Sequence, residues 1–178
     1  MSQRRVQIVI LCEDIQQEVF ARYFLKKRGF TGRFRAKICP KGSQSGEQYV
    51  RSQYPVEVKA YRPNKNRVAI GLVVLIDADT GTLAARLNGL ASVLRGSNEA
   101  IAIFVPKRNI ETWIHYLQGE TVNEEDAYAK FENNEAVCKT AVEDLADRCY
   151  SQSLPEDAPR SLQAACGELQ RLLPLLQP

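Results

Sequence analysis

Carboxylate side chains follow three apolar runs of the sequence, a pattern that could build a metal-dependent site. The acids and the runs before them are Glu13 after 7–12, Asp77 and Asp79 after 72–76, and Glu111 six residues after 100–105. Runs of this length, rich in Val and Ile, are typical of buried parallel strands. An open α/β sheet keeps its site at the carboxyl ends of its strands, so we expect the four carboxylates to meet there. They would repel one another without a cation, and oxygen ligands suit Mg²⁺ or Mn²⁺.

Each acid also has a purely structural interpretation. Asp14 and Asp79 could cap the helices that follow them, because Asp is a favourable N-cap residue. Glu111 falls in the first turn of a predicted helix, where a negative charge favours the helix dipole. Glu13 has no such role, because it leaves its strand directly. In an extended chain, Asp77 and Asp79 would point the same way and could bracket one cation.

Strand and helix signals alternate along the first two thirds of the chain. The predicted strands are 6–12, 34–39, 68–76 and 100–105, and the predicted helices are 14–28, 46–61 with a possible break at Pro55, 80–95 capped by Thr80, and 109–117. This β-α alternation predicts an α/β fold with a mainly parallel four-stranded sheet flanked by helices.

The alternation of strand and helix signals ends at Gly119, and no strand signal follows. We therefore expect an α/β domain at 1–119 and a helical C-terminal extension at 120–178, with helices at 135–150 and 159–173. The extension ends in leucines that could pack on the flank of the sheet or dock a partner protein. These leucines are Leu162, Leu169, Leu172, Leu173, Leu175 and Leu176.

Charge is distributed unevenly over the 178 residues, although the net charge is only +3. Residues 1–70 hold 15 Lys and Arg against 5 Asp and Glu, and the remainder is acidic. A basic half suggests a polyanion such as DNA or RNA, unless these residues only solvate the surface. The basic residues of the first half include Arg33, Arg35, Lys37, Lys41, Lys59, Arg62, Lys65 and Arg67. On this interpretation Lys130 and Lys139, in the acidic half, should matter little.

Three cations are candidates for contacts with phosphate. Lys41 follows the second predicted strand, and Lys107 and Arg108 lie between the fourth strand and Glu111. Positive charge beside an acidic site could hold a phosphate or stabilise a leaving oxyanion.

Other classes of protein are disfavoured by the sequence. No segment reaches the roughly 20 apolar residues of a membrane span, and the N-terminal run is too short for a signal peptide. The five cysteines are odd in number and widely spaced, which predicts reduced thiols in a cytoplasmic protein. A zinc site is disfavoured because His115 is the only histidine.

The arrangement of these acids resembles the Toprim domain of topoisomerases, primases, OLD-type nucleases and ribosomal-RNA maturases. The segment PKRNIETWIHYL resembles small bacterial Toprim-like proteins, many of them from mobile or phage-defence gene neighbourhoods. The resemblance spans about residues 6–118. It implies a magnesium-dependent nuclease, with Glu13 as acid/base or metal ligand, Asp77 and Asp79 as the metal pair, and Glu111 as a later ligand. Family members often have Gly and a second acid where this chain has Asp14 and Gln17.

Two other functions are compatible with the same residues. The segment IDADTGTL is similar to the nucleophile loop of haloacid-dehalogenase phosphatases, although Thr80 interrupts its spacing and no later Asp-Asp pair follows a strand. The second alternative is a non-catalytic or partner-dependent subunit. Its partner would be an ATPase, a second defence subunit or another copy of the chain. Topoisomerase action is disfavoured because no tyrosine stands out as a nucleophile. We expect metal-dependent cleavage of phosphodiester bonds in nucleic acid.

Overall fold

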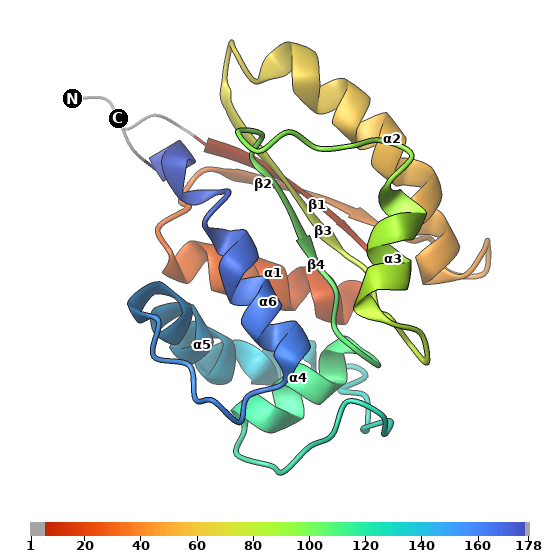
Figure 1. Ribbon diagram of the computed structural model, residues 1–178, viewed down its shortest axis with the longest axis vertical. Helices are drawn as coiled ribbons and strands as arrows, with labels where there is room; N and C mark the ends of the chain where they lie inside the picture. Colours follow the sequence, from red (N-terminus) through yellow and green to blue (C-terminus); the bar gives the residue numbers. More distant parts are fainter. Residues whose placement is uncertain (1–5, 177–178) are drawn as a thin grey trace.

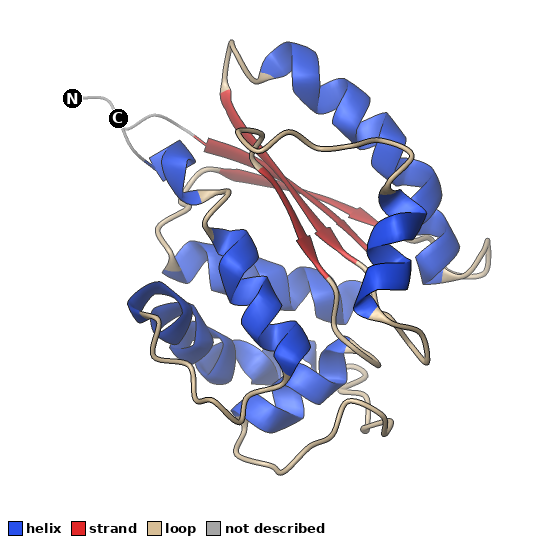
Figure 2. Cartoon of the chain, in the orientation of Figure 1, coloured by secondary structure: helices blue, strands red, loops and turns tan. Residues whose placement is uncertain are grey.

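The computed structural model describes residues 6–176 and has the predicted α/β fold (Figure 1, Figure 2). Its four strands are all parallel and lie in the order β2-β1-β3-β4. The strands are β1 Val6–Cys12, β2 Arg33–Ile38, β3 Ala69–Leu75 and β4 Ile101–Phe104. The helices are α1 Ile15–Lys27, α2 Gly46–Asn64, α3 Leu83–Leu90, α4 Ile110–Leu117, α5 Lys139–Ser151 and α6 Arg160–Leu169, with 3₁₀ turns η1 Glu135–Cys138 and η2 Leu173–Leu176.

Helices cover both faces of the sheet, as a parallel sheet requires. The α2 helix packs on β1 and β3 with α3 beside it, while α1 and α6 lie on the opposite face (Figure 1). The α5 helix packs against α1 and α6 and forms an outer layer. Strand β3 is buried along almost its whole length, whereas β2, at the edge of the sheet, is largely exposed.

The order of the strands places a switch point at the centre of the sheet. From β1 the chain moves to β2 on one side and then crosses to β3 on the other. Ligands of open α/β sheets bind outside the carboxyl ends of the strands at such a point. Here it lies between the ends of β1 and β3, where Glu13 and Asp77 follow their strands.

The C-terminal helices join the same core. Trp113 of α4 is fully buried, packs on Phe20 of α1 with ring centroids 5.7 Å apart, and donates a 2.8 Å hydrogen bond to Ser161 of α6. Leu162, Leu169 and Leu172 are also fully buried. These three leucines are therefore part of the core and are not a docking face.

The helices expected at 135–150 and 159–173 are Lys139–Ser151, after a 3₁₀ turn, and Arg160–Leu169. Two helices of the α/β part also differ from their predicted limits. The expected helix at 80–95 is shortened to Leu83–Leu90. It begins late because the chain turns at Gly81 and Thr82, not Thr80, caps Ala85, and it ends early in turns at Ala91 and Val93. The α2 helix continues through Pro55 to Asn64. Pro55 removes a single backbone donor, and the buried Tyr54, Val58 and Tyr61 hold the helix on the sheet.

A disulfide between Cys149 and Cys166 contradicts the prediction that all cysteines are reduced. The two residues are distant in sequence, but α5 and α6 are neighbours and bring their Cα atoms to 5.0 Å. Cys12, Cys39 and Cys138 are free thiols. Among residues 6–176, no helix combines the length and the apolar character needed to cross a bilayer.

Candidate functional site

Glu13 and Asp77 are in direct contact at the switch point of the sheet. The Glu13 carboxylate accepts a hydrogen bond from the backbone N–H of Asp77, across the gap between the ends of β1 and β3. The same carboxylate accepts from the Gln17 side-chain amide at 3.2 Å. The prediction that Glu13 and Asp77 lie close together at the ends of their strands is confirmed.

The Asp77 side chain is a buried carboxylate whose hydrogen-bonding capacity is incompletely used. Asp77 is 8% exposed, and its Oδ1 has no hydrogen-bond partner among the residues that the structure describes. Burial, followed by the negative charges of Glu13, Asp14 and Glu111, raises the pKa of Asp77 well above its usual value. A buried polar atom without a partner costs free energy, and a bound cation would remove that cost.

The pKa of Glu13 is shifted in the same direction as that of Asp77. Burial raises the pKa of Glu13 from 4.5 to about 7, although hydrogen bonds from the Asp77 backbone and from Gln17 oppose the shift. The charges of Asp79 and Asp14 raise it further. A carboxyl group with a pKa near neutrality can exchange protons at physiological pH, as a general acid or base must.

Glu111 approaches the same edge from the start of α4. Asn109 caps this helix, accepting from the Thr112 N–H, and holds Glu111 in the first turn with 3% exposure. Burial, together with the charge of Asp14, raises the pKa of Glu111. Glu13, Asp14 and Glu111 line one pocket of about 590 Å³. Asp14 caps α1 through Gln17 as expected, but it also belongs to the acidic wall of this pocket.

Two lysines complete the walls of this pocket. Lys41 enters from the loop after β2, as predicted, and Lys130 enters from the irregular segment after α4 together with Phe131. Lys130 lowers the pKa of Glu111, against the effect of burial, which places it close to the acids. The expectation that Lys130 matters little stays a prediction, and Lys139, which does not line the pocket, is the better control.

Asp79 does not lie beside Asp77 as an extended chain would require. Its backbone is left-handed, with φ of 52°, and its side chain is 59% exposed. The carboxylate pairs with Arg86 of α3 at 3.2 Å. Arg86 also donates to the Asp77 carbonyl and pairs with Glu47 of α2, so it fixes the loop after β3. The sequence signal for Arg86 was its position in the helix directly after this loop.

Lys107 and Arg108 do not line the acidic pocket. Lys107 pairs with Glu125 at 2.6 Å and lines a separate hollow beside the loops at 122–125 and 156–160. Arg108 has a φ of 70°, and its carbonyl accepts from the Asp79 N–H. Part of the basic half is also neutralised internally, because Arg62 and Lys65 pair with Glu99.

The carboxylates at this edge of the sheet are candidates for holding a metal ion. No group of three or more Asp, Glu, His or Cys side chains within residues 6–176 is arranged to hold a metal ion. Mg²⁺ does not require such a group, since it usually binds through one or two carboxylates, water and substrate phosphate. Asp77 with its unpartnered oxygen and the adjacent Glu13 fit that smaller requirement.

Comparison of the chain with protein-family models, with curated proteins and with solved structures finds no match. The resemblance to Toprim proteins therefore stays a prediction that rests on the residues themselves.

Gly46 at the start of α2 offers a test of the packing around Glu13. A Cβ atom at this position would lie 2.6 Å from the Glu13 Cβ and 2.9 Å from its Oε1, so one of the two residues must move. We expect Gly46→Ala to destabilise the protein by about 1–3 kcal/mol and to weaken any thermal stabilisation by Mn²⁺. Urea unfolding and thermal melts measure the two effects.

Gly167 in α6 is the matched control. A Cβ atom there would meet nothing within 4 Å, so Gly167→Ala should leave stability unchanged or raise it by up to about 1 kcal/mol. If Gly46→Ala proved as harmless as Gly167→Ala, the close contact between α2 and Glu13 would be refuted.

Proposed function

We propose that the protein cleaves phosphodiester bonds of nucleic acid with the help of Mg²⁺ or Mn²⁺. The observation that carries this proposal is the unpartnered, buried Asp77 carboxylate oxygen beside Glu13 at the switch point of the sheet. A pair of carboxylates with raised pKa values at this point favours a bound cation over a structural role.

The carboxylates at the switch point and on the walls of the acidic pocket have distinct roles in this proposal. Asp77 and Glu13 would hold the cation, and when bound it polarises a phosphoryl oxygen and stabilises the leaving oxygen. Glu111 and Asp14 would orient the water that attacks the phosphorus, since both line the pocket. Asp79 would have to leave Arg86 before it could add a further ligand.

Two cations on the pocket walls support a nucleic-acid substrate. Lys41 and Lys130 belong to different loops and line the same pocket as the acids. They would contact the phosphates on either side of the scissile bond and place it over the carboxylates. Phe131, next to Lys130, would offer a ring face on which a base could stack.

Cleavage of single- and double-stranded DNA and RNA should be measured with Mg²⁺ or Mn²⁺ and with EDTA. We expect metal-dependent cleavage by the wild type and a loss of about 100-fold or more in Asp77→Asn and Glu13→Gln. Thermal melts with Mn²⁺ give an independent measure, since a bound cation raises the melting temperature and Asp77→Asn should abolish the rise. Lys139→Ala is the control for a change of charge outside the pocket.

The alternatives predict different results with the same protein. Hydrolysis of a small phosphomonoester without action on polynucleotide, lost in Asp77→Asn, would replace the nuclease by a phosphatase. A folded wild type that has neither activity, and whose melting temperature does not change with Mn²⁺, would favour a scaffold or partner-dependent subunit. The pairing of Asp79 with Arg86 is the observation that favours this second alternative.

A further inference from the structure

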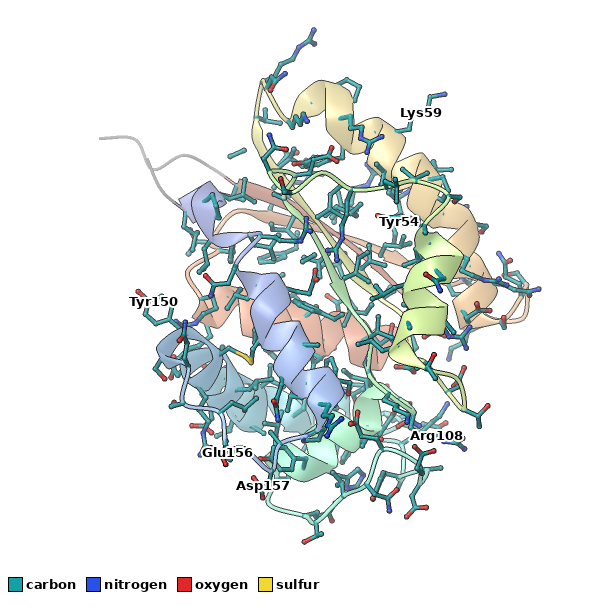
Figure 3. All side chains as sticks on the ribbon, viewed as in Figure 1. Tyr54, Lys59, Arg108, Tyr150, Glu156 and Asp157 are labelled. Carbon is teal, nitrogen blue, oxygen red and sulfur yellow. A yellow bond between two sulfur atoms is a disulfide. The ribbon has the colours of Figure 1, made fainter. Side chains whose placement is uncertain are left out.

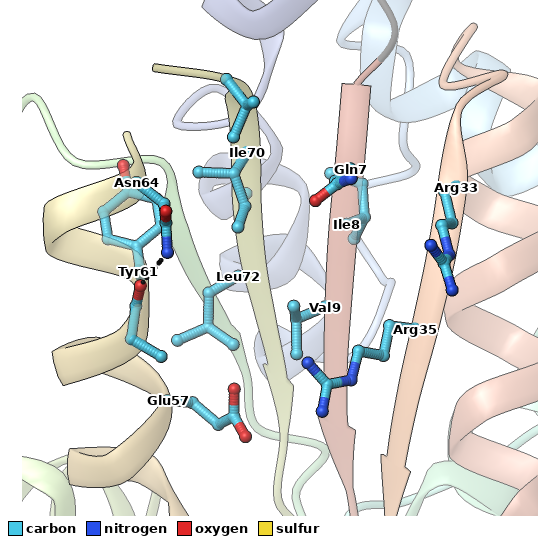
Figure 4. A pocket seen from close by; sticks show the side chains of 13 residues that line it. Gln7, Ile8, Val9, Arg33, Arg35, Glu57, Tyr61, Asn64, Ile70 and Leu72 are labelled. Atoms are coloured by element: carbon cyan, nitrogen blue, oxygen red, sulfur yellow. Dashed lines mark hydrogen bonds between the residues drawn. The ribbon is translucent and has the colours of Figure 1, made fainter. Parts of the chain in front are cut away.

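A second pocket lies on the face of the sheet and shares no lining residue with the acidic pocket. It has a volume of about 410 Å³ and lies between α2 and the strands β2, β1 and β3 (Figure 4). This volume is within the range of small-molecule sites. The pocket exists because α2 covers β3 and β1 and leaves the basic side of the edge strand β2 open.

The register of the strands explains the floor of this pocket. Gln7 pairs with Arg33 and with Ile70, and two residues further Val9 pairs with Arg35 and with Leu72. Alternate residues of a strand share a face, so these two rows point to the same side of the sheet. The floor is thus formed mainly by the apolar Val9, Ile70 and Leu72, with the Gln7 amide at one end and arginines on the β2 side (Figure 4).

Arg33 and Arg35 differ from other cations of the basic half. Neither forms an ion pair or a side-chain hydrogen bond with another described residue, whereas Lys37 pairs with Glu57 at 3.8 Å. The two arginines are about 7 Å apart along their strand, so both can reach one phosphate group. The planar guanidinium donates to phosphate through two N–H groups at once.

The opposite wall has the reverse chemistry. Glu57 of α2 lines the pocket and is 8% exposed. Its Oε1 pairs with Lys37, so Oε2 is the acceptor that the ligand would use. Figure 4 shows Glu57 beside Leu72, across the sheet from β2. A ligand that satisfies both walls needs an anion at one end and an N–H donor at the other, with a flat apolar body between them.

We propose that this pocket binds a nucleotide that carries an exocyclic amino group, as adenine and cytosine nucleotides do. Its phosphate contacts Arg33 and Arg35, its base lies on Val9, Ile70 and Leu72, and its amino group donates to Glu57. Uracil presents a carbonyl oxygen where cytosine has its amino group, which the carboxylate disfavours. The nucleotide is either free or the terminal unit of a strand.

Calorimetric titration of the full chain with AMP tests this site, with UMP, inorganic phosphate and a 5′-phosphorylated oligoadenylate as further probes. Saturable binding of AMP, and binding of UMP and of phosphate at least about tenfold weaker, supports the assignment. Tighter binding of the oligoadenylate than of AMP identifies the end of a strand as the source, and equal or weaker binding identifies the free nucleotide.

Arg33→Ala with Arg35→Ala should weaken the binding of AMP by about 100-fold, because two charged contacts are lost. Both residues are exposed, so the fold should be retained. Lys59→Ala with Arg67→Ala is the matched control, since it removes the same charge from exposed positions outside the pocket (Figure 3 labels Lys59). Glu57→Gln should narrow the difference between AMP and UMP.

The proposal is overturned if AMP does not bind, if phosphate alone binds as well as AMP, or if both double variants weaken binding equally. Asp77→Asn, which disables the proposed nuclease, should leave the binding of AMP unchanged. The two proposals can therefore fail separately.

Discussion

Reduction of the disulfide between Cys149 and Cys166 should lower the free energy of unfolding by about 3 kcal/mol. The bond joins α5 to α6 across 17 positions of sequence and closes a loop that the unfolded chain would otherwise leave free. Closing a loop of this length removes conformational entropy from the unfolded state, which stabilises the folded state. For a domain of ordinary stability, this loss is a substantial fraction of the free energy of unfolding.

Urea unfolding of the wild type with and without a thiol reductant measures this effect without any mutation. Cys149→Ala with Cys166→Ala should match the reduced wild type and should not respond to the reductant. Cys39→Ala, which removes a free and partly exposed thiol, is the control and should keep the full response. Equal midpoints for oxidised and reduced wild type would mean that the disulfide does not contribute to stability.

This disulfide could not be predicted from the sequence. Five cysteines at wide spacing carry no sign of which pair meets, because the pairing depends on how α5 packs against α6. That packing is set in turn by buried contacts such as the hydrogen bond from Trp113 to Ser161, between residues 48 positions apart. Such non-local contacts leave no periodic signal along the chain.

The strands, by contrast, were predictable from local pattern. The apolar runs give β1, β3 and β4 to within one or two residues, since each must be buried on both faces. Helices with a clear cap and a terminal glycine were equally accessible, as α1 shows with Asp14 before it and Gly29 after it. The α3 helix was predicted too long at both ends, because nothing in its periodicity signals the turns at Gly81 and Ala91.

The candidate site was predictable where it depends on strand ends and not where it depends on loops. Glu13 and Asp77 directly follow parallel neighbours, so topology alone brings them together. Asp79 and Arg108 both adopt positive φ, which no spacing rule predicts, and the Asp79 side chain pairs with Arg86. Lys130 reaches the pocket from a segment beyond the last strand, and only the folded chain shows its proximity to Glu111.

The metal-free protein should lose stability as the pH rises from about 4.5 to about 7 and beyond. Burial raises the pKa of Glu13 from 4.5 to about 7, so within this interval the folded protein binds a proton that the unfolded chain releases. Stability falls with pH wherever the folded state binds more protons. Asp77, whose pKa is raised well above its usual value by burial and by Glu13, acts in the same direction.

The free energy of unfolding should fall by on the order of 3 kcal/mol because of Glu13, since each unit of pKa shift corresponds to about 1.4 kcal/mol. Urea unfolding in EDTA at about pH 5 and about pH 8 measures it. Asp77→Asn should raise stability at the higher pH, because a buried charge and its repulsion of Glu13 are removed. Added Mn²⁺ should diminish the pH dependence of the wild type, since a cation favours the ionised carboxylates.

Glu99→Gln is the control for the loss of a buried carboxylate with the opposite shift. Hydrogen bonds from Arg62 lower the pKa of Glu99 from 4.5 to about 2, against the effect of burial. The stability that Glu99 contributes is therefore present above pH 4.5 and is lost only as the pH falls toward 2. Its substitution should lower stability almost equally at both test pH values and preserve the pH dependence. If the wild type instead gained stability between pH 5 and 8, Glu13 and Asp77 would have to be ionised at little cost in the folded protein, and the case for a cation between them would lose its electrostatic basis.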